Sequence, residues 1–217
     1  MKKIKTQRFA LILLAGGKGV RFGSSVPKQF LPLQSKPLVL HSLDLFISLE
    51  IFSQYIVVCD PLYKNIFENY SNIDFALPGK LRQDSLFNGL QKISSKIDFV
   101  CIHDGARPFI KKEEMLKLLS AAVEDKASAL GVPVTNTVKQ CDEKNFVERT
   151  IDRKNLWEIQ TPQVIALDLL KKGLLFAKEN KIEVTDDISL VELIGYKGRI
   201  VKGCYSNKKI TAPKDLL

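Results

Sequence analysis

The sequence has few of the residues that build metal centres and disulfide frameworks. Its 217 residues include only two histidines and four cysteines, and no two cysteines form a close pair. These residues are His41, His103, Cys59, Cys101, Cys141 and Cys204. A histidine-rich metal site and a zinc clamp of paired cysteines are therefore excluded. Each cysteine lies in or beside an apolar stretch, which predicts buried free thiols in a reducing cytosol.

Long hydrophobic runs are also absent. No apolar stretch approaches the roughly 18 residues that a membrane span requires. Lysines at positions 2, 3 and 5 before the apolar segment Phe9–Ala15 imitate a secretory signal. The apolar run is short, however, and Gly16-Gly17-Lys18-Gly19 follows it where a cleavage site of small residues would stand. The sequence therefore predicts a cytoplasmic protein that does not enter the membrane.

The overall composition is that of a globular protein. Hydrophobic residues make up 45% and charged residues 26% of the chain, which excludes a disordered or fibrous protein. The length predicts a single domain over residues 1–217. The net charge of +9 comes from scattered lysine pairs without interleaved aromatics, which disfavours nucleic acid as a partner. An anionic small substrate or simple solubility explains the charge equally well.

Apolar runs alternate with amphipathic stretches along most of the chain. The pattern predicts strands at 9–15, 55–59, 73–77, 99–102, 128–134 and 199–202, and helices at 37–49, 61–70, 82–93, 112–125, 166–178 and 188–194. Such alternation is typical of an α/β protein with a mostly parallel sheet covered by helices on both faces. The alternation breaks at about 135–157, where two short strands joined by a turn predict an inserted β-hairpin arm. An arm of this kind either caps the site or pairs with another subunit.

A glycine loop follows the first predicted strand. Glycines at positions 16, 17, 19 and 23 allow backbone N–H groups to approach a phosphate closely, although a simple turn also needs glycine. Neither the P-loop pattern nor the dinucleotide-binding pattern fits this segment. Arg21 and Lys28 follow the loop, and two cations beside such a cradle suit a nucleoside triphosphate.

Two further loops end neighbouring predicted strands and should meet the glycine loop at one edge of the sheet. The first carries Gly79, Arg82 and Ser85, although Ser85 could equally cap a helix or face solvent. The second carries Asp104, a single carboxylate suited to Mg²⁺ beside phosphates or, alternatively, to an ion pair with Arg107.

Other polar residues favour structural interpretations. Asp186 and Asp187 precede an apolar helical stretch, which favours helix N-capping over a second metal site. His41 lies in a leucine-rich helix and is predicted to be a partly buried structural residue. No Ser–His–acid arrangement can be assembled, so the site is expected to work by positioning and charge without a covalent nucleophile.

Together these motifs resemble those of the 2-C-methyl-D-erythritol 4-phosphate cytidylyltransferases of the non-mevalonate isoprenoid pathway. The order and spacing of the segments carry the resemblance over nearly the whole chain. They are the glycine loop with Arg21, Pro27-Lys28-Gln29-Phe30, Arg82-x-x-Ser85, His103-Asp104-x-Ala106-Arg107-Pro108, Pro133-Val134, Thr137-Val138-Lys139, Asp152-Arg153, Leu156-Trp157, Gln160-Thr161-Pro162-Gln163, Thr185-Asp186-Asp187 and Lys209-Ile210-Thr211.

The resemblance implies a Rossmann-like three-layer nucleotidyltransferase fold whose hairpin arm embraces a second subunit of a homodimer. It implies an enzyme that joins CTP and 2-C-methyl-D-erythritol 4-phosphate to give 4-diphosphocytidyl-2-C-methyl-D-erythritol and pyrophosphate, with Mg²⁺ as cofactor. The residues implied to contact CTP or to act in catalysis are Ala15, Gly16, Gly17, Gly19, Arg21, Lys28, Gly79, Arg82, Ser85 and Lys209. The residues implied to bind the acceptor phosphate are Arg107, Thr137, Arg153, Thr161, Thr185 and Lys209, and the implied metal ligand is Asp104.

Two alternatives remain open at this level. A ribitol 5-phosphate cytidylyltransferase would keep the chemistry and change the acceptor, whereas a non-catalytic nucleotide-binding module would keep only part of the site. Pro78 stands where the family usually has a glycine, which removes one N–H near the base.

Overall fold

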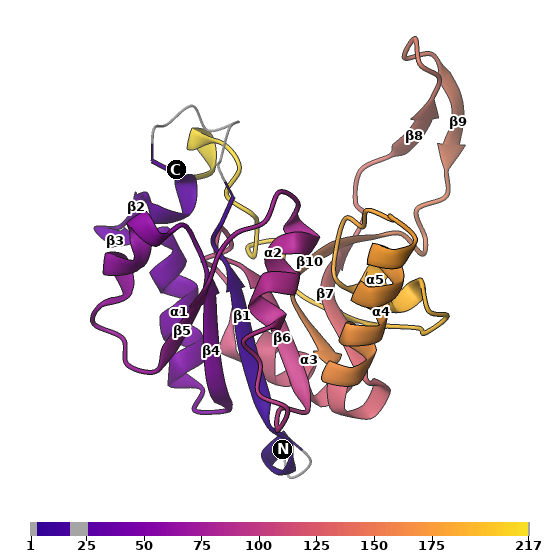
Figure 1. Ribbon diagram of the computed structural model, residues 1–217. Helices are drawn as coiled ribbons and strands as arrows, with labels where there is room; N and C mark the ends of the chain where they lie inside the picture. Colours follow the sequence, from indigo (N-terminus) through magenta and orange to yellow (C-terminus); the bar gives the residue numbers. More distant parts are fainter. Residues whose placement is uncertain (1–3, 18–25, 217) are drawn as a thin grey trace.

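The computed structural model describes residues 4–17 and 26–216. At its centre is a seven-stranded sheet in the order β11-β7-β10-β6-β1-β4-β5 (Figure 1). The strands are β1 (Phe9–Leu14), β4 (Phe52–Val58), β5 (Ile73–Ala76), β6 (Phe99–Asp104), β7 (Ala127–Pro133), β10 (Trp157–Ala166) and β11 (Arg199–Lys202). The mostly parallel α/β architecture expected from the sequence is confirmed, since β1 pairs in parallel with both β4 and β6.

Strand β10 was not predicted, and it is the one strand of this sheet that runs antiparallel to its neighbours, β6 and β7. Its centre reads Gln160-Thr161-Pro162-Gln163, and three polar residues around a proline are atypical of a central strand. The register with β7 shifts between Ile159 and Gln163, so the proline falls where the ladder is interrupted. Tertiary pairing therefore overrides the local sequence preference here.

Helices cover both faces of the sheet (Figure 1). They are α1 (Leu38–Ser48), α2 (Arg82–Leu90), α3 (Lys112–Asp125), α4 (Leu167–Glu179) and α5 (Ile188–Glu192). Successive side chains of a strand point to opposite faces, so Leu11 and Leu13 of β1 pack with α1 and α3, whereas Ala10 and Ile12 pack with α2, α4 and α5. The segment 61–70, predicted to be helical, forms the 3₁₀ helix η4 (Pro61–Phe67).

Shorter elements surround this core. The other 3₁₀ helices among the described residues are η1 (Ile4–Thr6), η3 (Lys28–Phe30) and η5 (Pro213–Leu216). Strands β2 (Pro32–Leu33) and β3 (Lys36–Pro37) form a small antiparallel pair. The predicted hairpin is present as β8 (Val138–Cys141) paired with β9 (Val147–Ile151), and it extends away from the body of the molecule (Figure 1).

The prediction of four buried thiols is wrong for two of them. Cys59 and Cys101 are buried in the sheet, but Cys141 is exposed and Cys204 is partly exposed. Cys141 lies on the hairpin arm, where no second layer covers it, and Cys204 follows the edge strand β11. Apolar neighbours in the sequence therefore indicate burial only where the element itself is covered.

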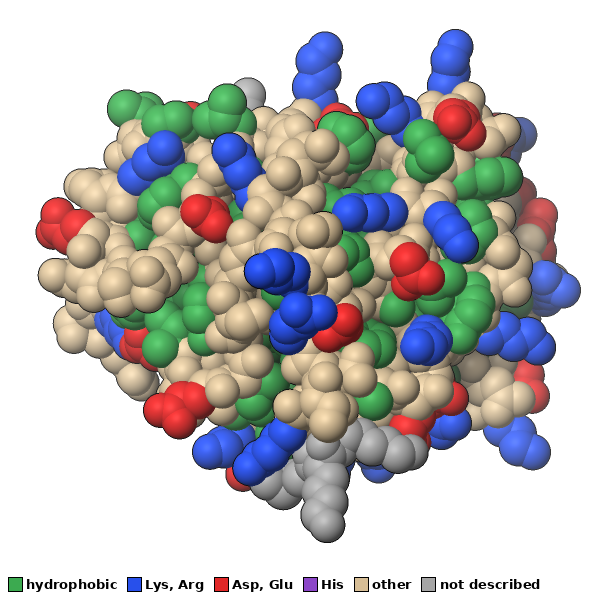
Figure 2. Space-filling model, turned by 60° about the horizontal axis from the view of Figure 1, so that its bottom comes forward, with side chains coloured by type: hydrophobic (Ala, Val, Ile, Leu, Met, Phe, Trp, Pro, Cys, Tyr) green, Lys and Arg blue, Asp and Glu red, His purple; other side chains and the backbone are tan. Residues whose placement is uncertain are grey.

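The charge distribution agrees with the scattered lysine pairs of the sequence. On the face shown in Figure 2, lysine and arginine side chains are scattered among carboxylates and apolar side chains and do not form a continuous basic stripe.

None of the helices in the described part of the chain is long and apolar enough to cross a membrane.

Candidate active site

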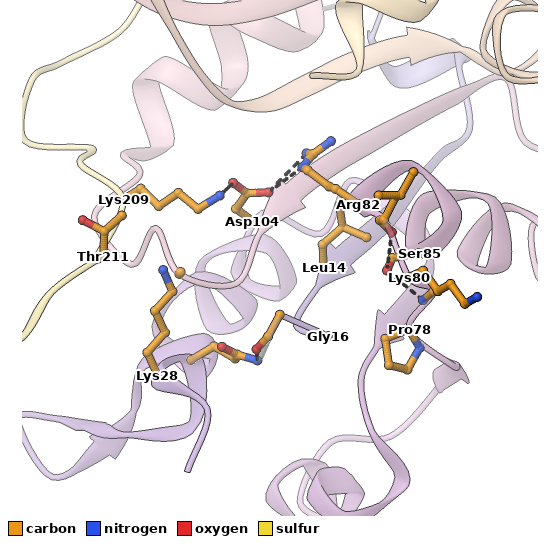
Figure 3. A pocket seen from close by; sticks show the side chains of 15 residues that line it. Leu14, Gly16, Lys28, Pro78, Lys80, Arg82, Ser85, Asp104, Lys209 and Thr211 are labelled. Atoms are coloured by element: carbon orange, nitrogen blue, oxygen red, sulfur yellow. Dashed lines mark hydrogen bonds and ion pairs between the residues drawn. The ribbon is translucent and has the colours of Figure 1, made fainter. Parts of the chain in front are cut away.

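The three loops singled out in the sequence meet at one pocket. They follow β1, β5 and β6, which are strands of the same parallel region, so their carboxyl ends lie at the same edge of the sheet. The pocket has a volume of about 910 Å³. The predicted site residues that line it are Gly16, Gly17, Lys28, Gly79, Arg82, Ser85, Asp104 and Lys209. Lys28 and Lys209 approach it from separate segments (Figure 3).

Gln29 holds the glycine loop from behind. Its side chain is 3% exposed, and its amide nitrogen donates to the carbonyl oxygens of Ala15 at 2.6 Å and Gly17 at 2.9 Å. The N–H of Ala15 donates to Val58 O at 2.8 Å, so this group is already engaged with β4. Gly16 and Gly17, but not Ala15, line the pocket. The proposed contact of Ala15 with the triphosphate therefore stays a prediction.

Gly16 also allows two loops to approach each other. A Cβ atom on Gly16 would lie 2.3 Å from the Cβ of Pro78, a distance that no side chain tolerates. Pro78 therefore packs directly against the glycine loop, and the next residue, Gly79, donates its N–H to Ser85 Oγ at 2.9 Å. The Ser85 hydroxyl donates in turn to Leu81 O at 3.2 Å. Ser85 thus stabilises the turn that begins α2, and its proposed contact with a base stays a prediction.

A chain of alternating charges crosses the pocket. Lys209 Nζ lies 2.6 Å from Asp104 Oδ2, and Arg82 Nη2 lies 3.1 Å from Asp104 Oδ1 (Figure 3). On its other side Arg82 binds Asp187, whose side chain is 1% exposed. Burial alone would raise the pKa of Asp104, but Arg82 and Lys209 outweigh it and hold that pKa well below its usual range. Asp104 is therefore a carboxylate in this site.

Two sequence interpretations are corrected by this network. The ion-pair alternative for Asp104 named Arg107, but the partners in the structure are Arg82 and Lys209. The side chain of Asp187 makes no capping hydrogen bond to α5 and binds Arg82 instead. Asp186 does accept from the N–H of Ser189 at 3.2 Å, so the capping prediction is confirmed for Asp186 alone.

A buried histidine supports the loop that carries Asp104. His103 is fully buried, and its Nε2–H donates to the carbonyl of Arg107 at 3.0 Å, because a carbonyl can only accept. Its Nδ1 then accepts from the Thr161 hydroxyl at 3.2 Å, while Thr161 Oγ1 accepts from the Asp104 N–H at 3.0 Å. Burial lowers the pKa of His103 to about 4, so the ring is neutral. This relay fixes the backbone around Asp104.

The segment that carries Lys209 is tied to the same loop. Asn207 is fully buried and donates to Thr161 O at 3.0 Å, while its own carbonyl accepts from Arg107 Nη1 at 2.8 Å. The N–H of Ile210 donates to Ala106 O at 2.8 Å. Lys209 lies between these two anchors, so its ammonium group reaches Asp104 from a well-determined backbone position.

The remaining predicted site residues lie apart from the pocket lining. Thr161 is 4% exposed behind Asp104, and the hydroxyl bonds described above occupy it, so its contact with an acceptor stays a prediction. Arg107 is half-buried beside Asn207, and Thr185 is exposed before α5. Thr137 and Arg153 are exposed at the hairpin arm. Gly19 and Arg21 lie outside the described residues.

Sequence reasoning missed the structural roles of Gln29 and Asp187. Gln29 stands between Lys28 and Phe30 in the 3₁₀ helix η3, and its place next to a predicted cation was the only signal in the sequence. For Asp187 the sequence suggested helix N-capping or a metal site, and the ion pair with Arg82 is neither of these. The His41 prediction is confirmed, since this partly buried ring contacts the Leu33 carbonyl at 2.9 Å.

The comparisons with known proteins agree on one enzyme family. The family model for 2-C-methyl-D-erythritol 4-phosphate cytidylyltransferase matches residues 9–217. The chain is similar to the enzyme of that name from Chlamydia pneumoniae, with 48% identity over 95% of both chains. It is similar to the chloroplastic enzyme of that name from rice, with 48% identity over 99% of this chain and 74% of the relative. The crystal structure of the Francisella tularensis enzyme of that name superposes with a TM-score of 0.85 at 30% identity, covering 97% of both chains.

Proposed function

Because the chain belongs to the 2-C-methyl-D-erythritol 4-phosphate cytidylyltransferase family, we propose that the pocket described above is where it performs this family's reaction. As a member of the family, the protein is a nucleotidyltransferase of isoprenoid precursor synthesis. It joins CTP and 2-C-methyl-D-erythritol 4-phosphate to give 4-diphosphocytidyl-2-C-methyl-D-erythritol and pyrophosphate. We further propose that residues 1–217 act as a single nucleotidyltransferase domain.

The reaction requires two polyanions to meet. A phosphate oxygen of the acceptor attacks the α-phosphorus of CTP, and the bond from that phosphorus to the bridging oxygen of pyrophosphate breaks. A phosphate dianion is already a nucleophile, so no general base is needed. Like charges about 4 Å apart repel by about 1 to 4 kcal/mol per pair at the dielectric of a protein surface. The protein must therefore supply positive charge at the point of contact.

Lys28 and Lys209 are the residues that we assign to this task. The observation that carries the proposal is that both residues line one pocket together with Gly16 and Asp104, and that they reach it from separate segments of the chain (Figure 3). Gly16 and Gly17 would cradle the triphosphate, with Gln29 holding their loop. The proposed catalytic role of Arg21 rests on the resemblance alone, since that residue lies outside the described part of the chain.

The nucleotide base is proposed to lie toward Gly79, Arg82 and Ser85 on the other side of the pocket. These residues follow β5 and begin α2, and they line the pocket next to the glycine loop, against which Pro78 packs. The acceptor phosphate is proposed to meet Arg107 and Lys209, with further contacts from the segments of Thr161 and Thr185.

Asp104 fits a magnesium ion of the kind that arrives with a nucleotide. Among the described residues no group of three or more histidine, cysteine or acidic side chains could enclose a metal. Mg²⁺ commonly takes one or two carboxylates from the protein and completes its shell with substrate phosphates and waters. Asp104, an ionised carboxylate at the pocket, would hold it on this pattern. Bound there, the ion would neutralise charge on the triphosphate.

The hairpin arm supports a homodimer. Its side chains are almost all exposed, and Phe146 and Val147 are 70% and 58% exposed. A two-stranded hairpin is only marginally stable alone in water. We propose that the arm at about 135–157 packs on a second copy of the chain and brings Thr137 and Arg153 to the acceptor site of that partner. The unpaired cysteines support a reducing compartment such as the cytoplasm.

Pyrophosphate release measures the proposed reaction directly. The purified protein is incubated with CTP and Mg²⁺, and with either 2-C-methyl-D-erythritol 4-phosphate or ribitol 5-phosphate. We expect rapid release with the first acceptor and little with the second. Lys28→Ala provides the control for release by a contaminant. Release that is faster with ribitol 5-phosphate would refute the acceptor, and release independent of any acceptor would refute the transfer.

A further inference from the structure

Asp187 is a buried carboxylate to which the reaction described above gives no task. Its side chain is 1% exposed at the position before α5, yet it makes no capping hydrogen bond to that helix. Asp186 accepts from the helix instead. A buried charge is costly unless it is paired, and burial raises the pKa of Asp187 while Arg82 counteracts that effect. The ion pair with Arg82 is therefore the contact from which a role for Asp187 must be inferred.

The pairing divides the Arg82 guanidinium between two carboxylates. Nη1 and Nη2 donate to the two oxygens of Asp187 at 2.5 and 2.9 Å, which is a bidentate contact. Toward Asp104, Nε at 3.2 Å and Nη2 at 3.1 Å both meet the same oxygen, Oδ1. The second oxygen of Asp104, Oδ2, is left to Lys209. Figure 3 shows Asp104 between these two cations.

A guanidinium and a carboxylate otherwise favour a two-oxygen contact. We propose that Asp187 is a positioning residue for the transfer reaction, which holds Arg82 so that Asp104 keeps Oδ2 free of the guanidinium and directed at Lys209. Asp104 then presents Oδ2 to Lys209, the cation that is proposed to meet the substrates. The inference rests on the role proposed above for Asp104.

Removal of the Asp187 charge has two opposite consequences. Asp187→Asn keeps the volume of the side chain but releases Arg82, which turns to bind both oxygens of Asp104. The rate of transfer should therefore fall. The pocket also loses a negative charge, and Arg82, still paired with Asp104, stays in the pocket lining beside the proposed base site, so the attraction for CTP is maintained or increased. A site that was merely disrupted would lose both rate and nucleotide binding.

The test measures kcat by pyrophosphate release and, separately, the Kd of CTP by calorimetry without acceptor. For Asp187→Asn we expect kcat to fall about tenfold or more, while the Kd of CTP stays equal or decreases. Asp186→Asn is the matched control, because it makes the same charge change one residue away. Asp186 contacts Gln163 Nε2 at 3.0 Å and the N–H of Ser189, not Arg82. Its kcat should stay close to that of the wild type.

A double variant tests whether Asp187 acts through Arg82. Adding Asp187→Asn to Arg82→Gln should lower kcat little further, because the guanidinium that Asp187 positions is already absent from the Arg82→Gln variant. Additive losses would overturn the proposal, as would an unchanged kcat with weakened CTP binding. Asp187→Ser replaces the asparagine variant if that variant fails to fold. If Asp104→Asn is as active as the wild type, the role of Asp104 itself fails. If only Asp104→Asn is impaired, this inference alone fails.

Discussion

The ring of His103 lies wholly inside the protein, directly before Asp104 on β6. It packs edge-on against Phe46, with ring centroids 5.1 Å apart. Both ring nitrogens are engaged, Nε2–H with the Arg107 carbonyl and Nδ1 with the Thr161 hydroxyl. Protonation of Nδ1 would leave two hydrogens facing each other across the contact with Thr161, unless its hydroxyl turned away. We therefore expect acid to destabilise the fold through this residue.

The magnitude follows from the pKa. Burial lowers the pKa of His103 from its ordinary value of 6.5 to about 4. Between these two values the unfolded chain binds a proton that the folded chain does not bind, so the free energy of unfolding falls as the pH falls. One proton over one pH unit corresponds to about 1.4 kcal/mol. Acidification across this window should therefore remove about 3 kcal/mol of stability, and the contribution is fully present above pH 6.5.

Urea unfolding at a series of pH values from 7 to 4 measures this effect. The variant His103→Gln retains one donor and one acceptor but cannot take up a proton in this range. The difference in stability between wild type and His103→Gln should shrink by about 3 kcal/mol on acidification, whatever its value at neutral pH. His41→Gln, which removes the other histidine, serves as the matched control and should keep the steep pH dependence of the wild type.

The reasoning would be refuted if the free energy of unfolding of wild type and of His103→Gln changed with pH in parallel. If His103→Gln loses as much stability as the wild type between pH 6.5 and 4, another group carries the acid sensitivity. If His41→Gln flattens the curve instead, the assignment to His103 is wrong.

Four further substitutions test the site itself. Lys28→Ala should remove about 2 to 4 kcal/mol of transition-state stabilisation, so kcat should fall more than the KM for CTP rises. A change in KM alone would contradict the catalytic role of Lys28. Gln29→Met, which keeps the volume but removes both donors to the glycine loop, should raise the KM for CTP about tenfold, and an unchanged KM would show that the loop holds itself. Asp104→Asn should fold normally and weaken the Mg²⁺ dependence and the rate, whereas full wild-type activity in excess chelator would exclude the metal. Arg153→Ala should raise the KM for the acceptor more than that for CTP. Its mixture with Lys28→Ala should regain activity through mixed dimers, and if no activity returns after proven subunit exchange, the shared site is excluded.

Much of the fold follows from local patterns in the sequence. Buried parallel strands read as apolar runs, and β1 and β6 are buried along nearly their whole length, so they were recognised directly. Helix α3 matches its predicted range of 112–125 for a similar reason, since its apolar side chains recur on one face. Strand β10 was missed because its partners, and not its own residues, make it a strand.

The functional residues divide in the same way. Glycines and charged side chains after strand ends, among them Lys28 and Asp104, could be recognised because a parallel sheet gathers its carboxyl ends at one edge. The residues that position these side chains and glycines could not be recognised from the sequence. Gln29 acts on carbonyl groups 12 and 14 residues away, and Arg82 meets Asp187 across 105 residues of chain. A hydrogen bond depends on distances of about 3 Å in space, and separation along the chain contains no information about such distances until the chain has folded.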